Sequence, residues 1–235
     1  MIDTVLLDVD GTLIDSNEAH ARAWADTLRA HGWSEVTWQE ILPLIGMGGD
    51  KLLPKVIGVA IDSPQGKKLA KERTEHFLVA YAPTIRAFPR TRELIEAFRD
   101  RGLKRVIATS AKENELDALL ERAGVADLIT RETTSDDAKG KSKPEPDIIL
   151  AALAKARSTP GQAIMIGDTP YDVEAATSAG VRTIALRCGG WGDGPLSGAA
   201  AIYADPAELL DRLEDSPLGR QSLSAQPARH SHRRP

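Results

Sequence analysis

Short apolar runs without polar alternation recur along the chain, and most are followed by a segment with helical spacing. The clearest runs span residues 4–9 and 163–166, and residues 105–108 and 181–186 resemble them. Continuous apolar runs of this length suit strands that are buried on both faces of a parallel sheet. We therefore predict strands at these four places.

Helical spacing fills the intervals between these runs. Leu116 and Leu120 share one face of a predicted helix, and Gly124 marks its end. A further helix with the same spacing begins after Pro146. Strands and helices alternate in this way over residues 88–214, which predicts a doubly wound α/β fold, a parallel sheet with right-handed crossovers.

One long segment, residues 17–83, breaks the alternation because it carries helix signals and no convincing strand signal. Thr37 with Glu40 forms a capping box, and Ser63 before Pro64 is a typical helix start. We expect an inserted α-helical cap that moves over the strand ends, with a fixed helical layer on the sheet as the alternative. The predicted core domain then comprises residues 1–16 and 84–215.

The composition is that of a globular protein with an acidic body and a basic end. The 235 residues carry a formal charge of −4, and 42% of them are hydrophobic, enough to form a core. Residues 216–235 contain four arginines and no acid, which leaves −8 for the rest of the chain. We expect this polar tail to be disordered, and the acidic body argues against a nucleic-acid surface.

Targeting signals are not apparent. No run of about 18 apolar residues occurs, so we expect no membrane span. Residues 1–4 include an acid and no basic segment, unlike a secretory signal. Cys188 is the single cysteine, which excludes an internal disulfide and a thiolate metal cage. A cytoplasmic location is therefore expected.

Polar side chains collect where ligands bind in open α/β sheets, beyond the carboxyl ends of the strands. They come from four separate stretches of sequence. The stretches hold Asp8 and Asp10 after the first strand, Thr109 and Ser110 after the strand at 105–108, Lys143 in a polar loop before a helix, and Asp168 and Asp172 after the strand at 163–166.

The acidic residues of this set predict a cation. Asp8, Asp10 and Asp168 are expected to converge, and buried like charges need compensation. Oxygen ligands favour a hard ion, so we predict a Mg²⁺ site at these three residues, for which two direct carboxylates and a backbone carbonyl suffice.

The remaining residues suit a phosphate group. Lys143 is able to neutralise an attacking carboxylate and a phosphate oxygen together. Thr109 offers a hydroxyl, and the backbone N–H groups of Gly11 and Ser110 can donate to phosphate oxygens. The set therefore suits phosphoryl transfer to a carboxylate.

The order and spacing of these motifs resemble the haloacid dehalogenase superfamily. The motifs are DVDGT at residues 8–12, Thr-Ser at 109–110, a lysine before proline at 143–144, and GDTPYD at 167–172. The resemblance covers residues 3–214. The inserted helical block is similar to the small α-helical cap of the first type in that family.

The resemblance implies a role for each residue. Asp8 would be the nucleophile that becomes an aspartyl-phosphate. Asp10 would protonate the leaving group and then activate water. The supporting roles would fall to Thr109, which holds the phosphoryl group, Lys143, which steadies nucleophile and phosphate, Asp168, which completes the Mg²⁺ site, and Asp172, a more distant or water-mediated partner of the metal.

Three of these residues also have purely structural alternatives. Thr109 would satisfy backbone groups at a strand end. Lys143 lies in a lysine-rich run, which is typical of a solvated surface. Asp172 would cap the helix that follows it.

Asp10 favours phosphomonoester hydrolysis among the family's reactions, because the resemblance implies that its dehalogenases lack an acid there. The expected substrate is a small phosphorylated metabolite. A β-phosphoglucomutase is the rival, since residues 15–24 resemble the start of that enzyme's cap, including His20, which would help to place the general acid. Against it, Gly49 stands where the mutase carries an arginine for a second phosphate, although Lys51 lies nearby.

The glycine-rich loop at residues 46–51 is our candidate for substrate specificity. Its glycines allow a close backbone approach, and Lys51 is able to meet a small anionic substrate such as phosphoglycolate or a sugar phosphate. A plain turn with Asp50 as N-cap is the alternative. A nonenzymatic binding module would predict a broken catalytic position, and all are intact. We expect a monomer or a homodimer.

Overall fold

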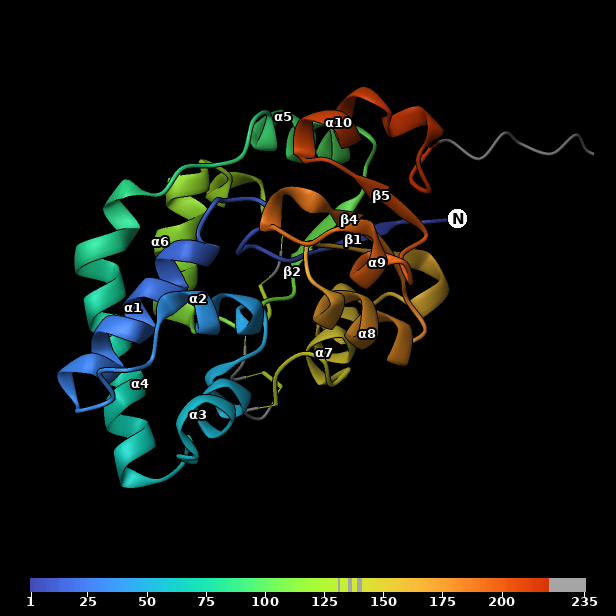
Figure 1. Cartoon of the computed structure of the whole chain (residues 1–235). Coiled ribbons are helices and arrows are strands. Elements are labelled where there is room, and N and C mark those ends of the chain that lie inside the picture. Colours follow the sequence, from blue (N-terminus) through green and yellow to red (C-terminus); the bar gives the residue numbers. More distant parts are fainter. Residues whose placement is uncertain (131, 135–136, 139–140, 220–235) are drawn as a thin grey trace, which may run out of the picture.

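The computed structural model describes residues 1–130, 132–134, 137–138 and 141–219. Within this part of the chain, five parallel strands form one sheet in the order β2-β1-β3-β4-β5 (Figure 1). The strands are β1 (Thr4–Leu7), β2 (Lys104–Ile107), β3 (Ala163–Gly167), β4 (Arg182–Leu186) and β5 (Ala201–Tyr203). β2 and β3 lie on opposite sides of β1, so the connections between the strands run in opposite directions from β1. Sheets of this kind bind ligands at the carboxyl end of such a strand.

Helices cover both faces of this sheet. Leu6 and Met165 pack with α7 and α8 on one face, whereas Val5 and Leu7 belong to the cluster that α5, α6 and α10 join on the other. Alternate strand residues are thus buried on opposite faces, which explains the continuous apolar runs and confirms the predicted doubly wound α/β fold. These helices are α5 (Thr91–Asp100), α6 (Glu113–Ala123), α7 (Asp147–Ala156), α8 (Pro170–Ser178), α9 (Asp193–Leu196) and α10 (Pro206–Asp211).

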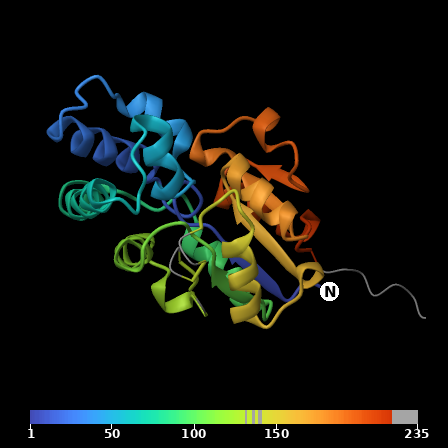
Figure 2. The same ribbon diagram turned by 90° about the horizontal axis from the view of Figure 1, so that it is seen from below.

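The helical block after β1 has an apolar cluster of its own, in which Trp24, Leu28 and Leu53 are buried. Figure 2 shows this block, coloured blue to teal, beside the sheet. The capping box of Thr37 and Glu40 is present. This separate cluster supports a helical cap, whose boundaries and motion remain predictions. Its helices are α1 (Asn17–Ala30), α2 (Trp38–Ile41), α3 (Gly49–Ile57) and α4 (Pro64–His76).

Two strands differ from the prediction by more than one residue at an end. β5 was not predicted, because three residues are too few to show an apolar pattern. β1 is shorter than the predicted strand at residues 4–9. The Val9 carbonyl accepts hydrogen bonds from the N–H groups of Thr12 and Leu13, so the chain has already turned at this point.

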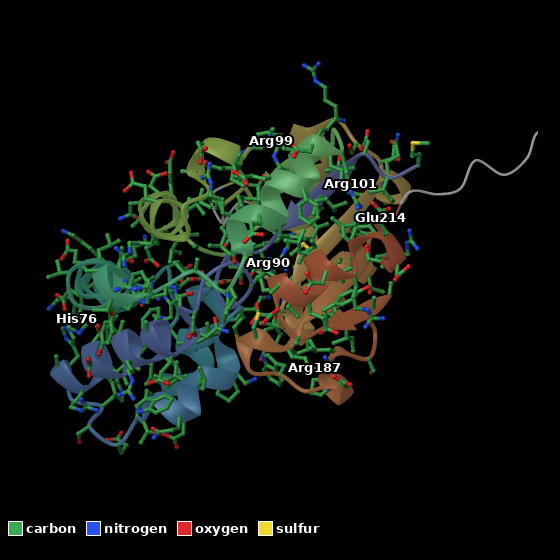
Figure 3. All side chains as sticks on the ribbon, turned by 90° about the horizontal axis from the view of Figure 1, so that it is seen from above. His76, Arg90, Arg99, Arg101, Arg187 and Glu214 are labelled. Atoms are coloured by element: carbon green, nitrogen blue, oxygen red, sulfur yellow. The ribbon has the colours of Figure 1, made fainter. Side chains whose placement is uncertain are left out.

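The packed chain extends past the predicted boundary at residue 215. Leu218 is buried in the main core cluster. Arg101 Nη2 lies 2.6 Å from Glu214 Oε1, and Figure 3 shows the two side chains next to each other where α5 meets the end of the described chain. Residues 216–219 of the tail predicted to be disordered at 216–235 are therefore packed against the core, and residues 220–235 lie outside the described residues. None of the described helices is long and apolar enough to cross a membrane.

The core on the α6 side of the sheet gives a stability prediction. Leu119 on α6 is fully buried, whereas Leu150 on α7 is 48% exposed. We expect Leu119→Ala to lower the free energy of unfolding by about 2–5 kcal/mol, because it removes buried methyl groups and leaves a cavity. Leu150→Ala should change it by less than about 1 kcal/mol. Urea unfolding of both variants checks this, and equal losses would contradict the assignment.

Candidate active site

The sheet brings the predicted catalytic residues together at the carboxyl end of β1. The Asp8 N–H donates to the Ile166 carbonyl at 2.9 Å, so Asp8 continues the line of β1 beside β3. Asp168 directly follows β3, and Asp172 lies in the first turn of α8. Lys143 reaches the same point from the loop before α7, with its ammonium group fully buried.

Three carboxylates and one lysine form the centre of the site. Oxygens of Asp8, Asp168 and Asp172 lie within 4.8 Å of one another, and all three residues are buried. Lys143 Nζ lies 2.5 Å from Asp8 Oδ1 and 2.6 Å from Asp172 Oδ1. One lysine leaves two of the three negative charges uncompensated. An all-oxygen donor set with this excess charge fits a hard divalent cation such as Mg²⁺.

The charges in this cluster shift one another's pKa values. Burial raises the pKa of Asp8 to about 7; Asp172 and Asp10 add to the rise, and Lys143 opposes it. Burial also raises the pKa of Asp168 well above its ordinary value, with help from Asp8 and Asp172. Burial works against the charged form of Lys143, but its two carboxylate partners outweigh this and raise its pKa. Asp8 and Asp168 therefore hold protons more tightly than usual unless a cation binds.

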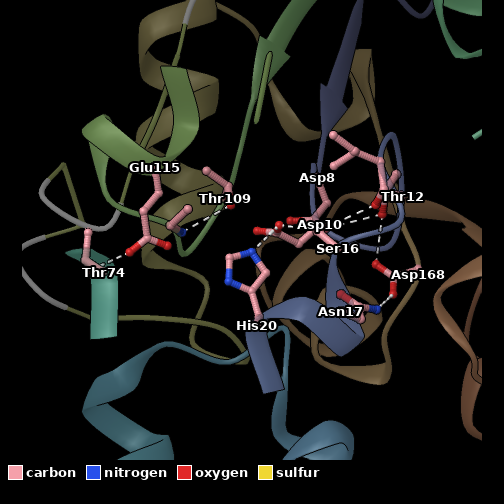
Figure 4. A network of polar contacts seen from close by, with 12 residues as sticks. Asp8, Asp10, Thr12, Ser16, Asn17, His20, Thr74, Thr109, Glu115 and Asp168 are labelled. Atoms are coloured by element: carbon pink, nitrogen blue, oxygen red, sulfur yellow. Dashed lines mark hydrogen bonds and ion pairs between the residues drawn. The ribbon is translucent and has the colours of Figure 1, made fainter. Parts of the chain in front are cut away.

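Two polar side chains that the sequence did not single out hold Asp168 in place (Figure 4). The Thr12 hydroxyl donates to Asp168 Oδ1 at 2.9 Å and lies 3.3 Å from Asp8 Oδ2. Asn17 Nδ2 donates to Asp168 Oδ2 at 3.0 Å. Thr12 belongs to the DVDGT motif, so its position was a usable signal, whereas Asn17 resembles any polar residue at a helix start.

Asp172 does two things at once. Its Oδ2 accepts hydrogen bonds from the N–H and the hydroxyl of Thr169, at 3.1 and 2.7 Å, in a capping box that begins α8. Its Oδ1 pairs with Lys143. Asp172 thus caps the following helix, as the structural alternative held, and it lies closer to the centre of the site than we expected; its role toward a metal stays a prediction.

The Asp10 side chain lies outside the cluster of Asp8, Asp168 and Asp172, so a contribution of Asp10 to the predicted Mg²⁺ site would come from its backbone carbonyl, which the prediction allowed and which stays a prediction. Asp10 Oδ1 lies 2.6 Å from the Ser16 hydroxyl and 2.7 Å from His20 Nε2. Burial acts to raise the pKa of Asp10, but its contacts with His20 and Ser16 outweigh burial and lower it. The side chain that joins Asp8 and Asp168 is that of Asp172.

A buried ion pair connects the helical block to α6 next to Asp10. Arg73 Nη1 donates to both carboxylate oxygens of Glu115, at 2.7 and 2.6 Å, and Arg73 Nη2 contacts His20 Nδ1. An arginine has no acceptor, so His20 Nδ1 accepts and neutral His20 carries its hydrogen on Nε2, facing Asp10. We did not predict Arg73 or Glu115, because 42 residues separate them and no local motif marks either.

The predicted phosphate-binding groups are only partly in place. The Gly11 N–H donates to the Ile14 carbonyl at 2.9 Å, so it is not directed at a ligand as we expected. Gly11 instead has φ +74°, and a Cβ there would lie 2.3 Å from Asp168 Oδ2, so the position needs glycine. Thr109 and Ser110 line a pocket together with Asp8 and Asp10.

The cap loop at residues 46–51 contacts the chain on both sides of Lys143. Lys51 forms an ion pair with Glu145, and Asp50 Oδ1 accepts a hydrogen bond of 2.6 Å from the Ser142 hydroxyl. Lys51 is therefore directed away from the substrate pocket, contrary to our expectation. Asp50 is not the N-cap of α3 either, because that position belongs to Gly48.

The pocket above Asp8 lies between the sheet and the helical block. Its volume is about 100 Å³, small beside the ~300–1,000 Å³ of pockets for drug-sized ligands. His20 and Gly49, two of the predicted specificity residues, line it, and Lys51 does not. The cavity thus suits a small substrate.

Comparison with known proteins agrees with this geometry. Residues 5–186 match the family described as haloacid dehalogenase-like hydrolase. The chain belongs to this family. It is 30% identical to the phosphoglycolate phosphatase of Rhodospirillum rubrum over 97% of this chain and 98% of that one. It is 28% identical to the N-acetylmuramic acid 6-phosphate phosphatase of Pseudomonas aeruginosa, over 91% and 95%.

A solved structure shares the fold as well. A hydrolase from Pseudomonas syringae superposes with a TM-score of 0.83 at 30% identity, covering 90% of this chain and 98% of that one. The predicted family resemblance is confirmed by these matches. The expectation of an enzyme is confirmed too, because the family is one of hydrolases and both relatives above are phosphatases.

The raised pKa values of the cluster give a prediction for the metal-free protein. Folding raises the pKa of Asp8 from 3.8 to about 7, so the folded state holds this proton more tightly than the unfolded state. The free energy of unfolding should therefore fall as pH rises from 5 to 7, by up to ~1.4 kcal/mol per pH unit for each such group. Urea unfolding in EDTA over this pH range measures the fall in the free energy of unfolding.

Asp8→Asn is the matched control, because asparagine stays neutral throughout this pH range. Its free energy of unfolding should fall less between pH 5 and 7 than that of the natural protein. Identical pH dependence in the two proteins would contradict the assignment of a raised pKa to Asp8.

Proposed function

We propose that the protein is a Mg²⁺-dependent phosphatase that hydrolyses a small phosphomonoester through an aspartyl-phosphate on Asp8. The observation that carries this is the buried contact of Lys143 with Asp8, in a carboxylate cluster at the edge of a small pocket. Such a contact gives Asp8 a counter-charge while its other oxygen remains available for attack. The two phosphatase relatives support the same class of reaction.

In the first step, an Asp8 oxygen attacks phosphorus, the ester P–O bond breaks, and the leaving oxygen takes a proton from Asp10. Bound Mg²⁺, held by Asp8, Asp168 and Asp172, would supply charge neutralisation for the phosphate oxygens. Lys143 stabilises the same developing charge from the protein side. Thr109 and Ser110, which follow β2 and line the pocket, would donate hydrogen bonds to the phosphoryl group.

In the second step, Asp10 accepts a proton from water, which attacks phosphorus and breaks the bond to Asp8, releasing phosphate. The contacts with His20 and Ser16 favour the carboxylate form of Asp10, which accepts this proton and then donates it to the leaving group of the next substrate. His20 also belongs to α1 of the helical block, so the position of Asp10 depends on where that block lies. One residue thus serves as acid and then as base.

A sugar-phosphate mutase remains the second candidate because His20 meets Asp10 as that resemblance implied. A mutase must bind a second phosphate. The arginine expected for that phosphate is replaced by Gly49, and Lys51 is directed away from the pocket. Both observations favour the phosphatase. A cytoplasmic location fits the single free cysteine, Cys188, and a metabolite substrate, and we include it in the proposal.

Replacing the nucleophile tests the proposal directly. We expect Asp8→Asn to lower Mg²⁺-dependent hydrolysis of p-nitrophenyl phosphate at least ~10³-fold, because an amide cannot form the acyl phosphate. Asp117→Asn, which changes an exposed aspartate on α6, should retain activity. Unchanged turnover in the Asp8 variant, or turnover unaffected by EDTA, would overturn the mechanism.

Asp10 should matter most for poor leaving groups. p-Nitrophenolate leaves without a proton, whereas a sugar alkoxide needs one, and a general acid contributes ~10²–10⁴-fold. We expect Asp10→Asn to lower kcat/KM for glucose 6-phosphate by one or more orders of magnitude beyond its effect on p-nitrophenyl phosphate. Equal losses on the two substrates would argue against Asp10 as the acid. Glucose 6-phosphate formed from β-glucose 1-phosphate faster than free phosphate would favour the mutase.

A further inference from the structure

The pocket has a wall that the proposed mechanism does not use. Asp8, Thr109 and Ser110 line the end where the phosphate binds in that mechanism, so the leaving group must face the remaining lining. Most of this lining comes from the helical block and is apolar, and it also contains a pair of opposite charges from α4 and α6. The apolar members include Trp24, Ile45, Leu52 and Ala70.

The two charges of this wall compensate each other. Arg73 Nη1 donates to both oxygens of Glu115, and the Thr74 hydroxyl donates to Glu115 Oε1 at 2.5 Å. Arg73 is 7% exposed and Glu115 3%, so water screens the pair little. The other contact of Arg73 is with His20, which is neutral in this arrangement. The wall therefore offers the leaving group no net positive charge.

A leaving group with its own negative charge would meet two obstacles here. Glu115 would repel it, and Arg73 could serve it only by leaving Glu115 buried without a compensating positive charge, which is strongly unfavourable. Lys143 is already paired with Asp8 and Asp172. The other cation among the described lining residues is Lys112, whose side chain is exposed at the start of α6 and so is screened by water.

We infer that Glu115 is a specificity-determining residue that restricts this enzyme to phosphate esters of uncharged, hydroxyl-bearing leaving groups such as polyols or sugars. The inference rests on the proposed phosphatase function. Hydroxyl groups suit this wall because they can donate to Glu115 and accept from Arg73 Nε, which is buried without a hydrogen-bond partner among the described residues. The apolar side chains cover the carbon skeleton.

A matched pair of substrates tests this without any variant. 2-Hydroxyethyl phosphate and phosphoglycolate have the same number of carbons. The first carries an alcohol where the second carries a carboxylate. We expect the natural protein with Mg²⁺ to show a kcat/KM at least ~10-fold higher for 2-hydroxyethyl phosphate, because like charges brought together in a buried site are strongly disfavoured. Higher kcat/KM for phosphoglycolate would overturn the inference.

Glu115→Gln tests the residue itself, with Glu113→Gln as the control on an exposed position of the same helix. Glutamine keeps the size and an acceptor but removes the charge, so Arg73 becomes available to a carboxylate. We expect the kcat/KM ratio of the two substrates to shift at least ~10-fold toward phosphoglycolate in Glu115→Gln and to stay unchanged in Glu113→Gln. An unchanged ratio in Glu115→Gln would overturn the assignment.

Four further outcomes keep the test decisive. If phosphoglycolate is preferred and Lys112→Ala removes the preference, Lys112 sets the charge of the substrate and the inference is wrong. If the Glu115 variant does not fold, the comparison in the natural protein still decides. A natural protein that hydrolyses p-nitrophenyl phosphate but favours phosphoglycolate overturns only the inference, whereas one that hydrolyses no ester overturns the proposed function with it.

Discussion

Three buried carboxylates share a single buried lysine, and this excess of negative charge governs the arrangement of the whole site. Lys143 contacts Asp8 and Asp172, while Asp168 depends on hydrogen bonds from Thr12 and Asn17. The acidic groups come from the ends of β1 and β3 and from α8, so the parallel sheet creates the imbalance by bringing strand ends to one edge. Carboxylates kept this close are a costly arrangement for a protein unless a cation joins them.

The site divides into two regions of different charge balance. Around Asp8 the protein leaves negative charge uncompensated, as suits a region that receives a metal ion. Around Asp10 the opposite holds: His20, Ser16, Arg73 and Glu115 satisfy one another in a closed series of contacts from three elements. The first region is built to gain a ligand's charge. In the second, Arg73 balances Glu115, and the remaining negative charge is that of Asp10, the group that exchanges a proton.

Much of the fold and of the central chemistry could be predicted from the sequence, because both depend on local signals. Continuous apolar runs marked four strands, and Asp8, Asp168 and Lys143 follow recognisable motifs that the sheet gathers. β5 was missed, since three residues leave no periodic trace. The contact of Asp172 with Lys143 was missed as well, because sequence gives the strand end but not the direction of the side chain.

Contacts between the helical block and the core could not be predicted, for a related reason. Arg73 and Glu115 lie on separate helices with no shared motif, and each alone resembles an ordinary surface charge of an amphipathic helix. Lys51 was assigned to the pocket because it follows a glycine-rich loop, yet Glu145 offers it a nearer partner. Pairings of this kind depend on how the helical block packs against the core, and this packing produces no periodic pattern in the sequence.

The two contacts on either side of Lys143 connect the loop at residues 46–51 to the segment that carries this lysine. Asp50 and Lys51 belong to the loop that borders the substrate, and Ser142 and Glu145 flank the lysine that contacts the nucleophile. The loop that borders the pocket and the segment that carries Lys143 are therefore held together by two contacts. A redesign of the loop has to preserve both contacts to keep Lys143 in position, which narrows the range of sequences that the loop tolerates.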